Sequence, residues 1–307
     1  AHTVNGDLAI STGRDITQTG NLTVTGASSF TSSGTDNDIT LGGTNVLTGA
    51  ISATTVGTTG NVTIDNGTTA INLGTVTARG NLSVTGGAGI IDTGVITVAG
   101  TSLFHSDVGG QVITLDSANA MAGQVSITHT GAADVAIDNG TTALILGTVG
   151  VGQNFEARSG GAITDDGVIT VAGTATFVTD VNDIDINLNS SNAITGALTF
   201  TTQTGGSNGA DITLNNGSTA ISLATFTTEG NLTLTTSNTA AFDVKAHTVN
   251  GDLAISTGGD ITQTGNLTVT GTSSFTSSGT DNDITLGETN VLTGAISATT
   301  AGTTGHV

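Results

Sequence analysis

The sequence predicts an all-β protein, specifically a right-handed parallel β-helix (β-solenoid) with about 20 residues per coil. Three observations support this fold class. Residues 1–62 return at 246–307 with 57 identities in 62 positions and no gap. A finer step of about 20 residues recurs inside that long period. Apolar and polar residues alternate with a period of two, which is the period of a β-strand and not of a helix.

The long repeat has a period of 245 residues. We expect residues 1–307 to form one continuous β-solenoid that comprises one full period and the first quarter of the next. Because the second copy ends where the first runs on into a further motif, we interpret the chain as a section of a longer repetitive polypeptide. The copies differ at five places: Arg14 and Gly259, Ala27 and Thr272, Gly43 and Glu288, Val56 and Ala301, and Asn61 and His306.

Shorter motifs divide the period into three related blocks. "IDNGTTAINLG" begins at Ile64, "IDNGTTALILG" at Ile137 and "LNNGSTAISLA" at Leu214, so the spacings are 73 and 77 residues. Repeats of this kind are typical of a solenoid, and the last block holds about one extra unit of 20 residues. The predicted sub-blocks lie near 64–136, 137–213 and 214–307.

The expected strands are short and are separated by tight turns. In "NLTVTG", Leu22 and Val24 fall on one face of a strand, whereas Thr23 and Thr25 fall on the other. Thr, Val and Ile favour strands. Gly, Asn and Asp recur between them, where turns need a positive φ or side-chain hydrogen bonds to the backbone. Proline, tryptophan and tyrosine are absent, as expected for a thin coil whose strands pair on both sides.

The eight phenylalanines are expected at wide points of this narrow core. Four of them occupy the same place in a Gly-x-x-x-Phe motif that precedes an acidic turn. We interpret that place as one fixed corner of the core. The four are Phe30, Phe104, Phe177 and Phe275.

The charge balance restricts the classes of partner. The chain has 24 acidic residues against four basic ones, and its formal net charge is −20. Such a surface repels nucleic acid and anionic membranes, because it offers almost no cations to replace phosphate counterions. The sequence also lacks an apolar run of about 18 residues, so we expect no membrane insertion of these residues.

The alternating repeats resemble a known class of surface protein. "GNLTVTG", "GDLAISTGGDITQTGNLTVTG" and "ARGNLSVTGGAGI" are similar to the coil repeats of filamentous haemagglutinin-type exoproteins and to the strand-rich repeats of giant bacterial surface proteins. The resemblance extends over essentially the whole chain. It implies a secreted, very long, right-handed β-helical shaft on a bacterial surface.

Acidic turns are the candidate metal sites. Clustered carboxylate and amide oxygens suit Ca²⁺, which takes six to eight oxygen ligands. Asp and Asn also cap turns through hydrogen bonds to the backbone without a metal, so both interpretations remain open, and we expect no other cofactor. The candidate ligands are Asp36, Asn37, Asp38, Asp180, Asn182, Asp183, Asp281, Asn282 and Asp283.

Catalytic patterns are weak. Asp165–Asp166 and the pair Asp183 and Asp185 are compatible with acid–base chemistry on a sugar, but the chain lacks the aromatic platforms and basic residues such a site needs. No Ser-His-Asp arrangement, P-loop or dinucleotide fingerprint occurs. The histidines share no metal-ligand spacing; they are His2, His105, His129, His247 and His306. We therefore expect no enzyme.

The expected role is a non-catalytic structural shaft of an extracellular bacterial fibre or giant surface protein. Its partners would be copies or continuations of the same chain, end to end and side by side. Two alternatives are kept. One is an adhesin that binds a glycan or matrix ligand. The other is an ice-binding β-helix, suggested by outward Thr-x-Thr pairs at Thr23 and Thr25 and at Thr268 and Thr270, although these ranks are ragged along the repeats.

Overall fold

A computed structural model describes residues 1–129, 131–203, 205–206 and 209–307. These residues form 37 strands and no helix. The strands stack in parallel into a β-solenoid of about 14 turns with about 21 residues per turn. This confirms the fold class and the coil length that the repeats predict. Since no helix occurs in the described ranges, none is long and apolar enough to cross a bilayer.

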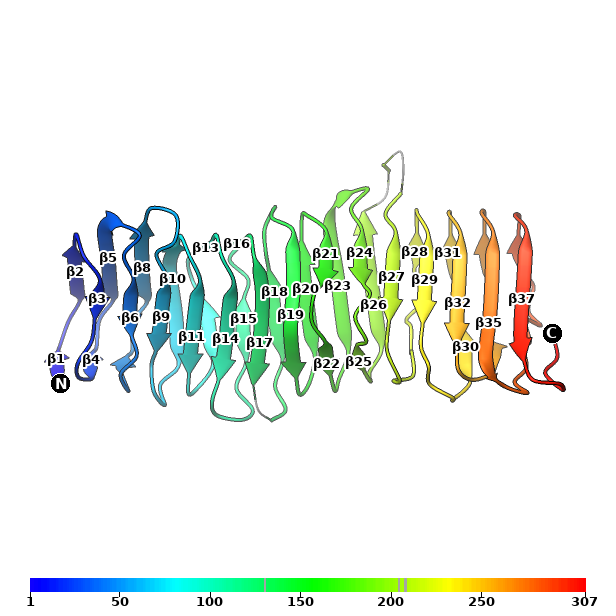
Figure 1. The fold of residues 1–307 in the computed structure, drawn as a ribbon, viewed down its shortest axis with the longest axis horizontal. Coiled ribbons are helices and arrows are strands. Elements are labelled where there is room, and N and C mark those ends of the chain that lie inside the picture. The colour runs from blue at the N-terminus through cyan, green and yellow to red at the C-terminus, as the bar shows by residue number, and fades with distance from the viewer. Residues whose placement is uncertain (130, 204, 207–208) are drawn as a thin grey trace. The chain divides into compact units, whose positions relative to one another are not determined.

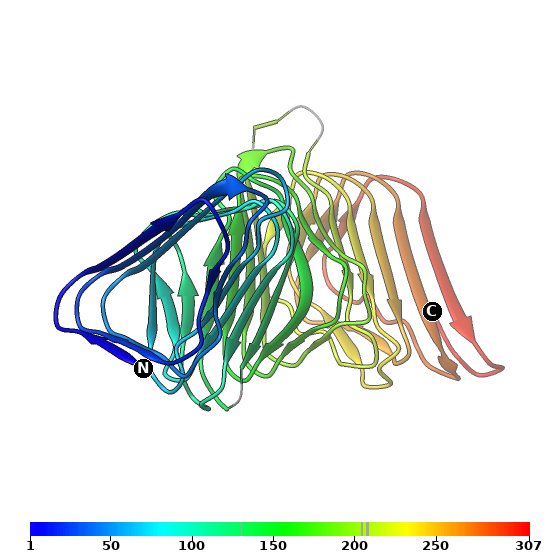
Figure 2. The ribbon, with the colours of Figure 1, turned by 60° about the vertical axis from the view of Figure 1, so that its left-hand side comes forward.

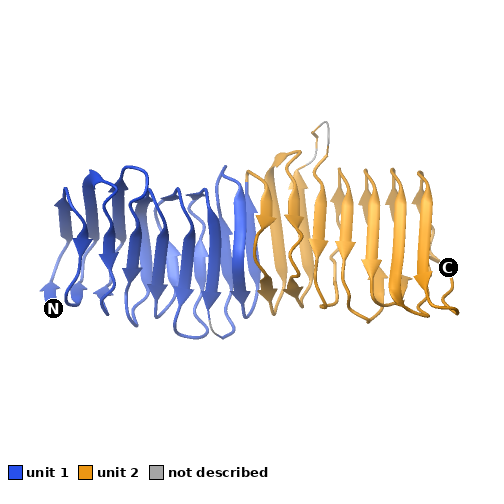
Figure 3. Cartoon of the chain, viewed as in Figure 1, with its two compact units in different colours: residues 1–159 blue, residues 160–307 orange. Residues whose placement is uncertain are grey.

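The chain divides into two compact units, Ala1–Ser159 and Gly160–Val307, which Figure 3 colours separately. Unit 1 has three columns of parallel strands (Figure 1). The first column is β1 (His2–Val4), β4 (Leu22–Val24) and β7 (Val46–Leu47). The second is β2 (Leu8–Thr12), β5 (Ser28–Thr35), β8 (Ile51–Val56), β10 (Ile71–Ala78), β12 (Ile90–Asp92), β15 (Ile113–Leu115), β18 (Val135–Asp138) and β20 (Phe155–Ser159). Beside this path, β13 (Ile96–Val98) pairs with β10, and β16 (Ala120–Met121) pairs with β13. The third is β3 (Ile16–Thr17), β6 (Ile39–Leu41), β9 (Val62–Asp65), β11 (Leu82–Gly86), β14 (Ser102–Ser106), β17 (Gln124–His129) and β19 (Leu144–Val151).

Unit 2 repeats this organisation with one long column and several short ones. The long column is β21 (Ile163–Asp165), β24 (Ile186–Leu188), β27 (Ile212–Asn215), β29 (Leu232–Thr235), β32 (Leu253–Thr257), β35 (Ser273–Thr280) and β37 (Ile296–Ala301). Another column is β28 (Thr227–Thr228), β31 (His247–Val249), β34 (Leu267–Val269) and β36 (Val291–Leu292). The remaining pairs are β22 (Ile169–Val171) with β25 (Ala193–Ile194), β23 (Ala175–Asn182) with β26 (Leu198–Gln203), and β30 (Phe242–Val244) with β33 (Ile261–Gln263).

Each strand pairs with the strand one coil further along the chain. Leu8 lies opposite Ser28, 20 residues on, and Ser28 lies opposite Ile51, 23 residues on. Figure 2 shows the first coils of unit 1, in blue, as nested turns that follow the same path. Because alternate side chains of a strand point to opposite faces, the coil step stacks inward residues above inward residues.

The core is a narrow stack of these inward side chains. Buried Ile, Leu, Val and Ala line it from strand to strand, and their neighbours in sequence are exposed or half-buried. The four phenylalanines that share the Gly-x-x-x-Phe motif are all fully buried, which confirms their assignment to the core. Their exposed fractions are 0% for Phe30, Phe104 and Phe177 and 1% for Phe275.

Candidate functional site: acidic turns, polar ladders and hollows

The acidic turns join one coil to the next. Asp36 follows β5 and has a φ of 59°, a left-handed conformation that Asp adopts more readily than most residues. Its Oδ1 accepts hydrogen bonds from the backbone N–H groups of Thr58 and Thr59, at 2.6 and 3.0 Å, one coil further on. These bonds hold the pKa of the Asp36 carboxyl below its usual range. Gly57 has a positive φ, and a Cβ there would overlap Asp36 Oδ1.

The second copy of this turn is built in the same way. Asp281 also has a φ of 59°, and its pKa is held low by hydrogen bonds from the backbone N–H groups of Thr304 and Thr303, whose nitrogens lie 2.9 and 2.8 Å from Oδ1. The asparagines that follow reach back to the previous coil, where Asn37 donates to Gly13 O and Asn282 donates to Gly258 O. The turn therefore ties three successive coils together.

The third residue of each acidic turn bonds to the next coil as well. Asp38 Oδ1 accepts from Asn61 N at 2.7 Å, and Asp283 Oδ1 accepts from His306 N at 2.8 Å. In the remaining candidate turn, Asp183 has a φ of 60° and accepts from Gly209 N, while Asp180 and Asn182 lie exposed at the end of β23.

No group of three or more His, Cys, Asp or Glu side chains able to hold a metal occurs among the described residues. The structure thus gives the hydrogen-bonded carboxylate oxygens of these turns a role in joining coils. Calcium binding there stays a prediction.

A ladder of exposed and half-buried Asp and Asn side chains, the Asx ladder, extends this pattern beyond the predicted residues. Each Oδ1 accepts the backbone N–H of the corresponding residue one coil further on, at 2.7 to 3.0 Å. In unit 1 the members are Asp15, Asp38, Asn61 and Asn81, ending at Thr101; in unit 2 they are Asp185, Asp211, Asn231 and Asp252, ending at Thr272. Gly-Asn and Gly-Asp pairs mark four of its members, Asn61, Asn81, Asn231 and Asp252, but the coil-to-coil hydrogen bonds were not predicted.

The "DNG" and "NNG" motifs are buried turns. Asn66 is fully buried, accepts from Leu47 N and donates to Leu47 O and Ala70 O. The Asn66 amide thus pairs with the backbone of Leu47 as a neighbouring strand would. This satisfies the N–H and C=O groups of Leu47, which would cost free energy if they were buried without a hydrogen-bonding partner. Asn139 and Asn216 make the corresponding bonds with Met121 and Ile194.

Asp165, one of the residues considered for acid–base chemistry, is 5% exposed. Its oxygens accept from Asn189 N, Ser190 N and Asn192 Nδ2 at 2.7 to 3.2 Å. Asp92 accepts in the same way from Asn119 Nδ2. These carboxylates hold turns of the coil. The other pair considered, Asp183 and Asp185, likewise accepts from backbone N–H groups.

The threonine ranks named by the sequence are interrupted. Thr23 stands between Thr3 and Val46 in the strand register, and Thr268 stands between Thr248 and Val291. A valine therefore ends each rank, after two threonines in unit 1 and after three, Thr227, Thr248 and Thr268, in unit 2.

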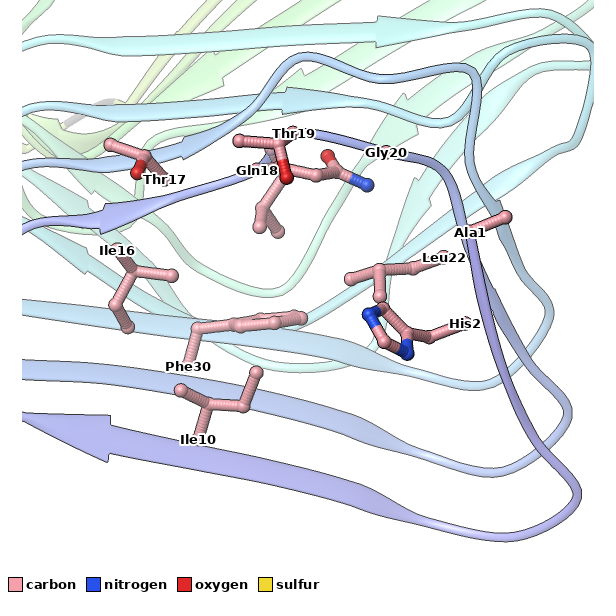
Figure 4. A pocket seen from close by; sticks show the side chains of 11 residues that line it. Ala1, His2, Ile10, Ile16, Thr17, Gln18, Thr19, Gly20, Leu22 and Phe30 are labelled. Atoms are coloured by element: carbon pink, nitrogen blue, oxygen red, sulfur yellow. The ribbon is translucent and has the colours of Figure 1, made fainter.

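Two hollows have aromatic side chains in their lining. The first, of about 260 Å³, lies against the first coil of unit 1, where Ile10, Ile16 and Phe30 line it together with His2 and Gln18 (Figure 4). The second, of about 290 Å³, lies in unit 2 beside Phe226 and His247. Sequence reasoning did not find the second hollow, because its residues come from different coils.

A family model described as repeats of unknown function (DUF5649) matches residues 1–54, 59–128, 132–201 and 229–299. These ranges cover most of the chain. Residues 1–54 correspond through the 245-residue period to 246–299, the later part of the last match. No curated protein and no solved structure matches the chain.

Proposed function

We propose that this chain, which belongs to the family of repeats of unknown function (DUF5649), is part of a non-catalytic structural shaft in an extracellular fibre or giant bacterial surface protein. The similarity of its repeats to those of filamentous haemagglutinin-type exoproteins supports the bacterial surface as its location. The shaft role rests on the coils themselves and does not need that resemblance.

One observation carries the proposal. Residues 1–62 and 246–307 form strands with the same register in both units: Leu8 opposes Ser28 as Leu253 opposes Ser273, and the bulge that follows Ser32 recurs after Ser277. A sequence that builds the same coils each time it occurs adds length without adding a new site. In repeat proteins of this type each unit contacts only its neighbours, so repetition extends a rod.

The turns support the same role. The Asx ladder and the buried asparagines add side-chain hydrogen bonds between coils to those of the backbone. The net charge of −20 keeps neighbouring shafts apart at low salt. We propose that contacts with other copies are made end to end, and that divalent ions bring shafts side by side. Neither nucleic acid nor membrane is proposed as a partner.

The test is whether length grows with the repeat. A tandem of two 245-residue periods is compared with a single period by electron microscopy and small-angle X-ray scattering. At about 4.8 Å per coil, each period is expected to add about 55 Å to a rod of constant width. A particle that becomes wider and not longer would contradict the shaft.

A ligand-binding adhesin is the second candidate function. The specific observation in its favour is the hollow beside Phe226, which a rod made only for length does not require. In that case the same coils would carry a binding site on one side.

A further inference from the structure

The hollow of unit 2 lies across three neighbouring coils and has no charged lining. Its volume is about 290 Å³. Strands β28, β31 and β34 pair side by side there, so that Thr227 lies opposite Thr248 and Thr248 lies opposite Thr268. The lining residues are Thr225, Phe226, Thr227, Ala246, His247, Thr248 and Asn266.

Phe226 gives this hollow an aromatic wall. Of the eight phenylalanines in the chain, all of which are described, seven are buried and Phe226 alone is half-buried. Its ring is 5.9 Å from the ring of Phe200 and 4.9 Å from the ring of His247, measured between centroids. Neighbouring rings thus hold Phe226 in place while part of it stays uncovered.

His247 is a buried group beside Phe226. It is 5% exposed, and its Nδ1 and Nε2 are closed to solvent and make no hydrogen bond of normal geometry within the described residues, although the carbonyl of Phe226 lies near. Burial lowers the pKa of His247 to about 4, so the ring is neutral at pH 7. Because the ring lies against Phe226, its NMR signal reports on this wall of the hollow.

Part of this hollow lies outside the family repeats. Thr225, Phe226 and Thr227 belong to residues 202–228, which lie between two matches of the family model.

We propose that this hollow binds a neutral sugar residue, whose apolar face lies against Phe226 and whose hydroxyls bond to the Thr side chains and Asn266, next to the buried ring of His247. A hydroxyl both donates and accepts, as do the threonine hydroxyls. A pocket that is largely uncharged on a chain of net charge −20 disfavours an anionic ligand. A single imidazole without other ligands disfavours a metal. The site goes beyond the shaft role and does not depend on it.

The test uses the whole chain and NMR of its five histidines. Glucose, galactose, mannose and N-acetylglucosamine are titrated at pH 7 while the ring Cε1–H signals are followed. At least one of these sugars is expected to shift the His247 signal saturably with a Kd of about 1 mM, a usual strength for a small hollow. The signal of His2 is expected to stay unchanged.

Variants locate the site. Phe226→Ala is expected to weaken binding about tenfold, and Thr248→Val about threefold, within the range of a lost aromatic contact and a lost hydrogen bond. Thr3→Val is the matched control, because Thr3 is the repeat counterpart of Thr248. It is expected to leave binding unchanged.

The proposal is overturned by any of three results. The first is the absence of a saturable shift with all four sugars at about 10 mM, ten times the expected Kd. The second is binding that persists undiminished in both Phe226→Ala and Thr248→Val. The third is an equal loss with Thr3→Val. Thr248 is half-buried on the outer face of its strand, so we expect Thr248→Val to fold. This variant still tests the proposal if Phe226→Ala fails to fold. The length measurement on tandem periods tests the shaft separately.

Discussion

Residues 1–62 and residues 246–307 have nearly the same sequence but different neighbours. In the first copy, β10 covers β8, and Ile51 is fully buried; β37 is the last strand described, so the counterpart Ile296 has no strand beyond it and is 57% exposed. At the start of the two copies the difference in burial has the opposite sign. Leu8 is half-buried, whereas Leu253 is 1% exposed beneath β29. Strand register is the same in both, so register follows the local sequence while burial depends on the adjoining coils.

This difference describes how the molecule is stabilised. Each coil buries apolar side chains of the two coils next to it, so the free energy gained by burial arises at the interfaces between coils. Substitutions at equivalent positions of the two copies should therefore have unequal effects wherever a neighbouring coil is involved, and equal effects wherever the contact is the same. The predictions below use that rule.

The largest effect is expected for Gly259→Arg. Arg14, its counterpart, is exposed, and both residues donate a backbone hydrogen bond to the threonine two positions earlier. Gly259 is buried, and a Cβ there would overlap the carbonyl oxygen of Ala240 in the previous coil. We expect Gly259→Arg to lower the free energy of unfolding by about 3 kcal/mol or more, measured by urea denaturation.

The control for this prediction is Arg14→Gly, which should change stability by less than about 0.5 kcal/mol. Hydrogen exchange should locate the loss in Gly259→Arg at the coils around Ala240. Equal effects of the two substitutions would show that the covering coil does not matter.

The next effect concerns pH and the two copies of one histidine. Burial, and then the charge of Lys245, lower the pKa of His247 to about 4, against the opposing effects of the Phe226 carbonyl and Asp243. The unfolded chain binds the proton first, near its usual pKa of about 6.5. Stability contributed by the neutral ring is therefore full above that pH and falls as the pH drops toward 4, by up to about 3 kcal/mol.

His247→Leu should remove this part of the pH dependence between pH 7 and 4, whereas His2→Leu should leave it as it is. The measurement is the urea midpoint across that pH range. A slope that survives in His247→Leu would assign the pH dependence to other groups.

A smaller effect is expected for a buried asparagine. Asn45 and Asn290 both accept from a leucine backbone N–H, at 2.8 Å from Leu22 and 2.9 Å from Leu267. Asn45 is fully buried and also donates to Asp65 O in the next coil. We expect Asn45→Ala to cost about 2 kcal/mol and Asn290→Ala about 1 kcal/mol, compared by urea denaturation. If the two variants lose the same free energy of unfolding, the hydrogen bond from Asn45 to Asp65 O does not stabilise the fold.

The smallest effect is expected at the acidic turn, where both copies make the same contacts. Asp36 and Asp281 each accept two backbone N–H groups, which lower their pKa. Stability from these carboxylates is present above the usual Asp pKa and is lost as the pH falls through the lowered one. Asp36→Asn and Asp281→Asn should give small and equal shifts in the acid unfolding midpoint. Clearly different shifts would mean that this turn also depends on more distant coils.

The sequence was sufficient for much of the fold. Alternation in "NLTVTG" predicted strands, the recurring motifs predicted the coil step, and the shared position of Phe30 and Phe275 predicted a buried corner. The acidic turns were also found. Their bonds to the next coil were not, because Asp36 and Thr58 are 22 residues apart and only the coil step brings them together. The hollow beside Phe226 escaped prediction for the same reason.

The sequence by itself determined the local conformation: period-two strands, glycine and Asx turns, and a register that is the same in both copies of a 62-residue segment. The strands and turns depend on residues close in the chain, where steric limits and short hydrogen bonds act without help from the rest of the molecule. The register joins residues 20 to 23 apart, and it recurs because both pairing partners lie within the repeated segment. Only the tertiary structure decided that the Asn66 amide pairs with the backbone of Leu47, or that His247 lies in the core against Phe226. Burial and the pKa of a buried group depend on which coil lies alongside, and identical residues acquire different surroundings when a different coil covers them.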